Sequence, residues 1–115
     1  MDIEIPEPIR KQCECLGGVN GLKKLMLSKR DASKKGKVLE AVANPTRMTI
    51  LCIIVKQPLC VCIIKELVGM PDSKLSYHLN ILKETGLIQG KRQGSWIIYY
   101  PTKKGQAATE LIKNL

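Results

Sequence analysis

Residues 73–88 read SKLSYHLNILKETGLI, and this stretch decides the fold. Leu75, Leu79 and Leu82 recur at the spacing of one helix face, so they predict an amphipathic helix. Gly86 follows closely and is well placed to end that helix. Polar side chains occupy the other faces. The pattern therefore predicts a helix that packs on a core through its leucines and presents a polar surface outward.

The chain on either side of this helix extends the pattern. Residues 60–68 predict a short helix before it, and Gly69-Met70-Pro71 breaks the chain between the two. Beyond it, residues 87–92 and 96–100 have the character of strands around Gln93-Gly94-Ser95, which predicts a β-hairpin. Two short helices joined by a tight turn and followed by a basic hairpin make a winged helix-turn-helix. The predicted fold class is mostly α with a β-hairpin wing.

The rest of the chain is expected to add further helices. Asn44 as N-cap and Pro45 at the first helical position predict the start of an apolar core helix, which ends before Pro58. Residues 19–30 predict an amphipathic helix rich in lysine, and residues 102–115 predict a terminal helix with an apolar side. These helices are expected to surround the core of one compact domain.

The N-terminal region is expected to be less regular. Pro6 and Pro8 are predicted to block a helix, and residues 31–37, DASKKGK, predict a turn. We therefore expect two parts, a flexible cysteine-containing arm over residues 1–18 and a winged helix-turn-helix domain for DNA binding and dimerisation over residues 19–115.

Composition narrows the class of protein. The chain has 115 residues, enough for one domain, and 44% of them are hydrophobic, with no Phe and one Trp, so the core must be aliphatic. No apolar run approaches the roughly 20 residues of a membrane span, and no basic-then-apolar signal opens the chain. We therefore expect a cytoplasmic protein without a membrane partner. The net charge of +9, with a basic excess over residues 72–104, favours a nucleic acid partner.

The polar face of this helix, which is expected to run to Thr85, is predicted to enter a DNA major groove. Asp72 or Ser73 is expected to cap its N-terminus. His78, the one histidine, has two interpretations: it contacts a phosphate, or it packs on the flank of the helix. Hydrogen bonds to base edges are expected from Ser76, Tyr77 and Asn80. The full predicted DNA-binding set is Ser73, Lys74, Ser76, Tyr77, His78, Asn80, Lys83, Lys91 and Arg92.

Four segments, in this order, closely resemble the ArsR/SmtB family of metal-responsive repressors: NPTRMTIL (44–51), PLCVCIIKEL (58–67), SKLSYHLNILKETGLI (73–88) and KRQGSWIIYY (91–100). The resemblance covers about Val38 to Tyr100. It implies a homodimer whose terminal helices pack together and whose two reading helices bind a palindromic double-stranded DNA operator. No nucleophile–base constellation or phosphate-binding loop is found, so we do not expect an enzyme.

The five cysteines form two C-x-C pairs, Cys13 with Cys15 and Cys60 with Cys62, while Cys52 is expected to pack in the core helix. Cys60 and Cys62 begin the first of the two short helices, and the N-terminus of a helix favours the thiolate form of a cysteine. Side chains two residues apart on an ideal helix diverge by about 200°, so these two share one ion only if the first turn is loosened. Otherwise both are small buried hydrophobes. The two pairs together offer four thiolates, a set that suits soft metals.

The family resemblance also bears on the cysteines. LCVC resembles the motif whose cysteines bind arsenic, antimony, cadmium or lead. The arsenic-sensing branch has a third thiol where this chain has Lys65, and the cadmium- and lead-sensing branch adds an N-terminal pair like Cys13 and Cys15. The C-terminal helix offers only Glu110, so a zinc site between such helices is not expected. The resemblance implies metal ligands Cys60, Cys62, Cys13 and Cys15, an inducer among arsenite, antimonite, cadmium, lead and zinc, and no cofactor for DNA binding.

Three functions follow from these observations. The first is a dimeric repressor that leaves its operator when a soft metal or metalloid binds the thiolates. The second is a redox regulator on the same scaffold, in which an arm cysteine forms a disulfide with Cys60 or Cys62; a bridge within one C-x-C would be cramped. The third is a metal-buffering protein, which the predicted reading helix and basic hairpin argue against.

Overall fold

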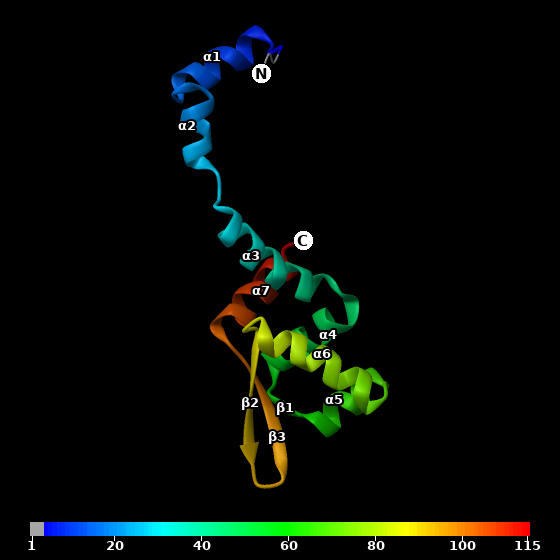
Figure 1. Ribbon diagram of the computed structural model, residues 1–115. Helices are drawn as coiled ribbons and strands as arrows, with labels where there is room; N and C mark the ends of the chain where they lie inside the picture. The colour runs from blue at the N-terminus through cyan, green and yellow to red at the C-terminus, as the bar shows by residue number, and fades with distance from the viewer. Residues whose placement is uncertain (1–3) are drawn as a thin grey trace. The chain divides into compact units, whose positions relative to one another are not determined.

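The computed structural model describes residues 4–115, which form two compact units that divide between Ser33 and Lys34. We describe each unit by itself. The first contains α1 (Glu7–Cys15), α2 (Gly18–Leu25) and the beginning of α3 (Lys29–Ala43). The second contains the remainder of α3 and all the other elements (Figure 1).

Helix α1 contradicts the prediction that the prolines block a helix. Pro6 is its N-cap, and Pro8 lies in its first turn. A proline there loses no hydrogen bond, because the first N–H groups of a helix have no intrahelical partner. Glu7 forms an ion pair with Arg10 one turn later. Residues 1–3 of the predicted arm lie outside the described residues, and the predicted boundary at residue 18 stays a prediction.

Helix α3 contradicts the predicted turn over residues 31–37. Ser28 accepts a hydrogen bond from the backbone N–H of Asp31 at 3.0 Å, the arrangement of an N-cap, and the helix then runs through Gly36 to Ala43. The helix predicted over residues 19–30 is correspondingly divided, because α2 ends at Leu25. The sequence signal for α3 was therefore the Ser28 cap.

Helix α4 (Pro45–Lys56) is the centre of the core, as predicted. The side chain of Asn44 accepts from the backbone N–H of Arg47 at 3.1 Å, which confirms the N-cap. Ile50, Leu51 and Ile54 are fully buried.

The two short helices are α5 (Val61–Val68) and α6 (Asp72–Glu84). Gly69 and Gly86 end them with positive φ angles of 63° and 76°, so the predicted stop at Gly86 is confirmed. The leucine face of α6 is buried as predicted. The cap prediction is wrong, because Pro71 is the N-cap and no side chain caps α6. On α5, Ile64 is fully buried, whereas Ile63 and Leu67 are exposed.

The sheet has three antiparallel strands in the order β1-β3-β2. β2 (Ile88–Gln93) and β3 (Trp96–Pro101) form the predicted hairpin, with Gly94 at a φ of 63° in its turn. The hairpin extends away from the helices of its unit as a wing (Figure 1). The two-residue strand β1 (Leu59–Cys60) was not predicted, and it pairs with β3 on the side opposite β2.

Helix α7 (Lys103–Lys113) closes the second unit. Thr102 caps it by accepting from the backbone N–H of Gly105 at 3.0 Å. Gly105 is buried directly against the chain at Leu87. Among residues 4–115 no single helix is long and apolar enough to cross a bilayer; α3 and α4 reach that length and apolarity only when joined across their 88° bend.

Candidate nucleic-acid interface and thiol site

Helix α6 presents an outer surface of polar side chains. Its leucines face the core, so the residues between them point away from it. The predicted contact residues that are exposed on α6 are Ser73, Lys74, Ser76, Tyr77, Asn80 and Lys83. This surface carries hydroxyl, amide and ammonium groups, which suit base edges and phosphates.

His78 differs from the other predicted contact residues because it is buried, with 7% of its surface exposed. Its Nδ1 lies 3.1 Å from the guanidinium of Arg47, and that guanidinium also donates to the carbonyl of Ala41 at 2.7 Å. Burial, then the charges of Arg47 and Lys74, lower the pKa of His78. These contacts favour packing on the helix flank over a phosphate contact. Sequence reasoning missed Arg47, although the quoted NPTRMTIL contains it.

The N-terminus of α6 is tied to α5 by an ion pair. Lys65 Nζ lies 2.8 Å from the carboxylate of Asp72, and both side chains are largely exposed. Exposed pairs of this kind contribute about 0–1 kcal/mol, so this one aligns the two helices more than it stabilises them. Asp72 also places negative charge at the positive end of the α6 dipole.

The two basic residues of the wing lie on opposite faces of the hairpin. Lys91 is paired with Ile98 and Arg92 with Ile97, and successive strand residues point to opposite sides. The ammonium of Lys91 lies 5.1 Å from the centre of the Tyr100 ring, a cation–π contact within the wing. Both are exposed.

The thiols of Cys60 and Cys62 lie together, with their sulfur atoms 2.7 Å apart. Cys60 is the extended N-cap of α5 (φ −77°, ψ 158°) and belongs to β1, whereas Cys62 is in the first turn of the helix. The extended backbone at Cys60 removes the divergence that an ideal helix would impose. Cys62 is exposed and Cys60 partly so, and the alternative that both are buried hydrophobes does not hold.

The contact between the two thiols shifts their pKa values in opposite directions. The hydrogen bond from Cys62 holds the pKa of Cys60 below its ordinary value, and the same bond is the main reason that the pKa of Cys62 is raised. Cys60 is thus the readier thiolate of the pair. Thiolate is the form that binds soft metals.

A surface hollow of about 460 Å³ lies beside the thiol pair. It brings together the start of α5, the Lys65–Asp72 ion pair and the tip of the wing. Its lining residues are Cys60, Val61, Cys62, Lys65, Asp72, Ser95, Trp96 and Ile97. Sequence reasoning missed Trp96, because only the pairing of β1 with β3 places the wing tip near the thiols. Within residues 4–115, no three His, Cys, Asp or Glu side chains are grouped to hold a metal ion.

The remaining cysteines lie elsewhere. Cys13 and Cys15 both belong to α1, where side chains two residues apart diverge by about 200°. Their part in a metal site stays a prediction. Cys52 is partly buried in α4, in keeping with the predicted packing role.

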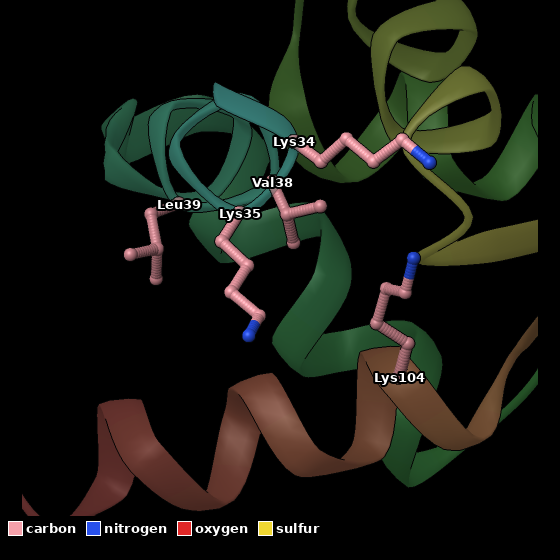
Figure 2. A pocket seen from close by; sticks show the side chains of 5 residues that line it. All are labelled: Lys34, Lys35, Val38, Leu39 and Lys104. Atoms are coloured by element: carbon pink, nitrogen blue, oxygen red, sulfur yellow. The ribbon is translucent and has the colours of Figure 1, made fainter. Parts of the chain in front are cut away.

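A second hollow, of about 440 Å³, lies on the α3 and α7 side of the same unit. Figure 2 shows Val38 and Leu39 on α3 and the lysines around them, with Lys104 reaching from α7. Leu39 and, on α7, Leu111 are both exposed. Apolar side chains exposed on two neighbouring helices are typical of a surface that meets another protein.

A core helix, a helix-turn-helix and a basic wing define this chain as a winged helix-turn-helix DNA-binding protein. The sequence model described as "Bacterial regulatory protein, arsR family" matches residues 44–89. The chain belongs to this family, the ArsR/SmtB family of transcriptional regulators. The family consists of DNA-binding regulators rather than enzymes, as predicted.

Three curated relatives illustrate the match. An uncharacterised HTH-type transcriptional regulator of Methanocaldococcus jannaschii is 35% identical over 68 residues, which are 58% of this chain and 76% of that protein. The regulator NmtR of Mycobacterium tuberculosis is 35% identical over 75% of this chain and 73% of its own length. A putative arsenical resistance operon repressor, ArsR, of Halobacterium salinarum is 40% identical over 61% of this chain, and the match spans just over half of that repressor, 56%.

Solved structures share the fold. NolR from Sinorhizobium fredii aligns with a TM-score of 0.70 at 28% identity, over 77% of this chain and 93% of that one. A homodimeric winged helix-turn-helix DNA-binding domain from Mycobacterium bovis gives 0.66 at 26%, over 76% and 85%. Reduced HlyU from Vibrio cholerae gives 0.67 at 26%, over 75% and 92%.

Proposed function

We propose that this regulator is a homodimeric repressor that leaves a palindromic DNA operator when a soft metal or metalloid binds the thiolates of Cys60 and Cys62. The observation that carries the proposal is the 2.7 Å approach of the two sulfur atoms at the surface. They lie between the wing and the start of α6, the helix predicted to enter the DNA major groove. The relative named as a putative arsenical resistance operon repressor supports this inducer class.

Dimerisation is supported by the exposed apolar side chains on α3 and α7 and by the homodimeric neighbour. A two-fold dimer presents two α6 helices to successive turns of one DNA face, which is why we expect a palindromic operator.

The test begins with a duplex that the protein selects from a random pool. Fluorescence anisotropy then follows release of this duplex as arsenite, antimonite, cadmium, lead or zinc is added. Cys60→Ser/Cys62→Ser should bind the duplex as the wild type does and should not release it. Cys52→Ser is the matched control, because it removes a thiol away from the pair, and it should release normally. Release from the double variant would refute the thiol pair as the sensor.

Redox sensing is the second candidate, and the structural likeness to a protein solved in a reduced form favours testing it. In this case hydrogen peroxide, not metal, would release the duplex, and dithiothreitol would restore binding. An intact mass lower by two hydrogens, or a cross-linked dimer on a non-reducing gel, would accompany release.

A further inference from the structure

We propose that Arg47 and His78 are positioning residues for sequence recognition, which hold the exposed ring of Tyr77 on α6 in the orientation in which it meets DNA. The contacts run from the guanidinium of Arg47 through the buried imidazole of His78 to the ring of Tyr77. They concern how a DNA sequence is recognised and not how an inducer releases it, so this role goes beyond the proposed function. The predicted contact of Tyr77 with base edges is its premise, and the experiment tests that contact separately.

The first contact opposes rotation of α6 about its own axis. His78 is buried, and its Nδ1 lies 3.1 Å from Nη1 of Arg47, which can only donate. The Nε–H of the same guanidinium donates to the carbonyl of Ala41 at 2.7 Å, so α3 holds Arg47 in place. The leucines of α6 make apolar contacts, which have no preferred direction, whereas a hydrogen bond requires one.

One other polar side-chain contact joins α6 to a neighbouring helix among residues 4–115, the exposed ion pair of Lys65 with Asp72. It lies at the first residue of α6, and water and salt weaken an exposed pair. The polar contact that holds the middle of α6, where Tyr77 lies, is therefore the bond between Arg47 and His78.

The second contact transmits the position of His78 to Tyr77. Neighbouring side chains on an ideal helix point about 100° apart, so the two rings meet at their edges and do not stack. Their centres lie 5.4 Å apart, and their planes form an angle of 66°. Tyr77 is 60% exposed, so few other groups restrain it. A side chain that is already held loses less conformational entropy on binding, and the imidazole therefore favours the bound orientation of Tyr77.

Protonation of His78 would break this series of contacts, because a proton on Nδ1 places two cations 3.1 Å apart. The main elements packed against α6 are α4 and β2, and their charged or titratable side chains are Arg47, Cys52, Lys56, Lys91 and Arg92. Of these, Arg47 acts on the imidazole, together with Lys74 on α6 itself. Burial and these two cations lower the pKa of His78, so the imidazole is the neutral acceptor at pH 7.5.

The experiment measures how well the full chain distinguishes base pairs, and not only how tightly it binds. Fluorescence anisotropy at pH 7.5, without inducer, compares the selected duplex with duplexes in which each base pair is changed in turn. Tyr77→Ala first identifies the base pairs whose discrimination depends on Tyr77. His78→Gln keeps an acceptor for Arg47 but removes the ring, whereas His78→Phe keeps a ring but removes the acceptor. Gly105→Ala is the control, because it crowds the carbonyl of Leu87 and leaves these contacts in place.

At the base pairs that Tyr77 contacts, both His78 variants should lose discrimination by about threefold to tenfold, the scale of one aromatic contact and one ordered side chain. Discrimination at the other base pairs should match the wild type, as it should everywhere in Gly105→Ala. In the Tyr77→Ala background, His78→Gln should add no further loss, because the two residues act as one unit.

The pH dependence provides a readout on the wild type itself, which decides the matter if the His78 variants fail to fold. From pH 7.5 to pH 5, over the range in which circular dichroism shows a folded protein, discrimination at the Tyr77 base pairs should fall. The midpoint of this fall should coincide with the midpoint at which the His78 ring titrates in the NMR spectrum. His78→Gln should show no such fall.

Three results would overturn this role for Arg47 and His78. The first is a Tyr77→Ala variant with unchanged preference at every base pair, which removes the premise. The second is an equal loss of affinity for all duplexes in the His78 variants, which would make His78 a packing residue only. The third is discrimination that stays constant while His78 titrates. No inducer is present in these measurements, so the proposed release by the thiol pair stands or fails separately.

Discussion

His78 holds α6 to the core helix α4 through one hydrogen bond. Arg47 only donates, so Nδ1 of His78 must accept, and the imidazole is neutral with its proton on Nε2. The same guanidinium donates to Ala41 at the end of α3, so one side chain links α3, α4 and α6. Protonating His78 would place two cations 3.1 Å apart in a buried position.

This geometry predicts loss of stability in mild acid. Because burial and the neighbouring charges lower the pKa of His78 below 6.5 in the folded protein, the unfolded chain binds the proton first as the pH falls. The free energy of unfolding should therefore decrease as the pH falls below about 6.5, down to the folded pKa. Urea denaturation at pH 8 and pH 5.5 measures this, and His78→Gln should remove the His78 part of the decrease.

The single histidine also permits a direct check. Its ring proton resonance in the NMR spectrum titrates without overlap from another imidazole, since the chain has one. A folded-state midpoint at or above 6.5 would contradict the contact between His78 and Arg47.

Two glycines should respond oppositely to alanine. A Cβ on Gly105 would lie 2.2 Å from the backbone oxygen of Leu87, so Gly105→Ala must move α7 away from Leu87, the residue before β2, and should destabilise the protein by about 1–3 kcal/mol. A Cβ on Gly36 meets nothing within 4 Å in the middle of α3, so Gly36→Ala should stabilise it by about 0.5–1 kcal/mol. Thermal unfolding followed by circular dichroism compares the two, and a loss of stability in both would show that α3 does not tolerate a side chain there.

At the scale of elements, the wing separates its two basic residues. Lys91 is held over Tyr100, whereas Arg92 points to the other face. A phosphate must draw Lys91 away from a contact worth about 0.5–1 kcal/mol, so we expect Arg92 to contribute more to DNA binding. In a dimer, Arg92→Ala removes two phosphate contacts and should reduce the slope of log affinity against log salt by about 1.8.

Measuring the salt slope of Lys91→Ala beside Arg92→Ala decides this point. Both should weaken binding to specific and random duplexes alike, because phosphate contacts carry no sequence information. By contrast, Ser76→Ala or Tyr77→Ala on α6 should change which duplex is preferred. Equal slopes for the two wing variants would mean that the hairpin twists on DNA to use both faces.

The elements that were predicted are those that local patterns specify. The period of Leu75, Leu79 and Leu82 and the turn at Gly94 suffice for α6 and the wing, and the cap at Asn44 fixes the start of α4. Strand β1 has two residues and exists only because β3 lies beside it, so no local pattern reveals it.

The same limit applies to the candidate site. The sequence identified the thiols, but whether they meet depends on the extended backbone that β1 gives to Cys60. The choice between the two interpretations of His78 likewise depends on Arg47, 31 residues earlier in the chain. Helix α1 was missed because its two prolines fall at the cap and in the first turn, the positions where proline is tolerated.

At the scale of the second unit, the thiol pair lies where α5, the start of α6 and the wing meet. Cys60 is hydrogen-bonded into the sheet that carries the wing, and Lys65 on the same short helix is paired with Asp72 at the start of α6. An inducer that shifts Cys60 would therefore act on both elements that we expect to contact DNA, α6 and the wing. Linkage requires the effect to be mutual: if the inducer weakens DNA binding by some factor, DNA weakens inducer binding by the same factor.

The arm cysteines should tighten the inducer site rather than create it. Cys60 and Cys62 are already adjacent, whereas Cys13 and Cys15 diverge on α1 and can bind one ion together only if the end of that helix unwinds. Reordering the arm costs about 1–2 kcal/mol per backbone residue fixed, which each new metal–sulfur bond must exceed. Cys13→Ser/Cys15→Ser should therefore lower cadmium affinity by about tenfold or more and reduce the thiolate-to-cadmium absorbance per ion, with little change in DNA affinity.

Cys52→Ser serves as the control and should match the wild type. An unchanged cadmium affinity and absorbance in the arm variant would exclude the arm as a metal ligand, and loss of a peroxide-dependent cross-link in that variant would assign the arm to redox chemistry instead.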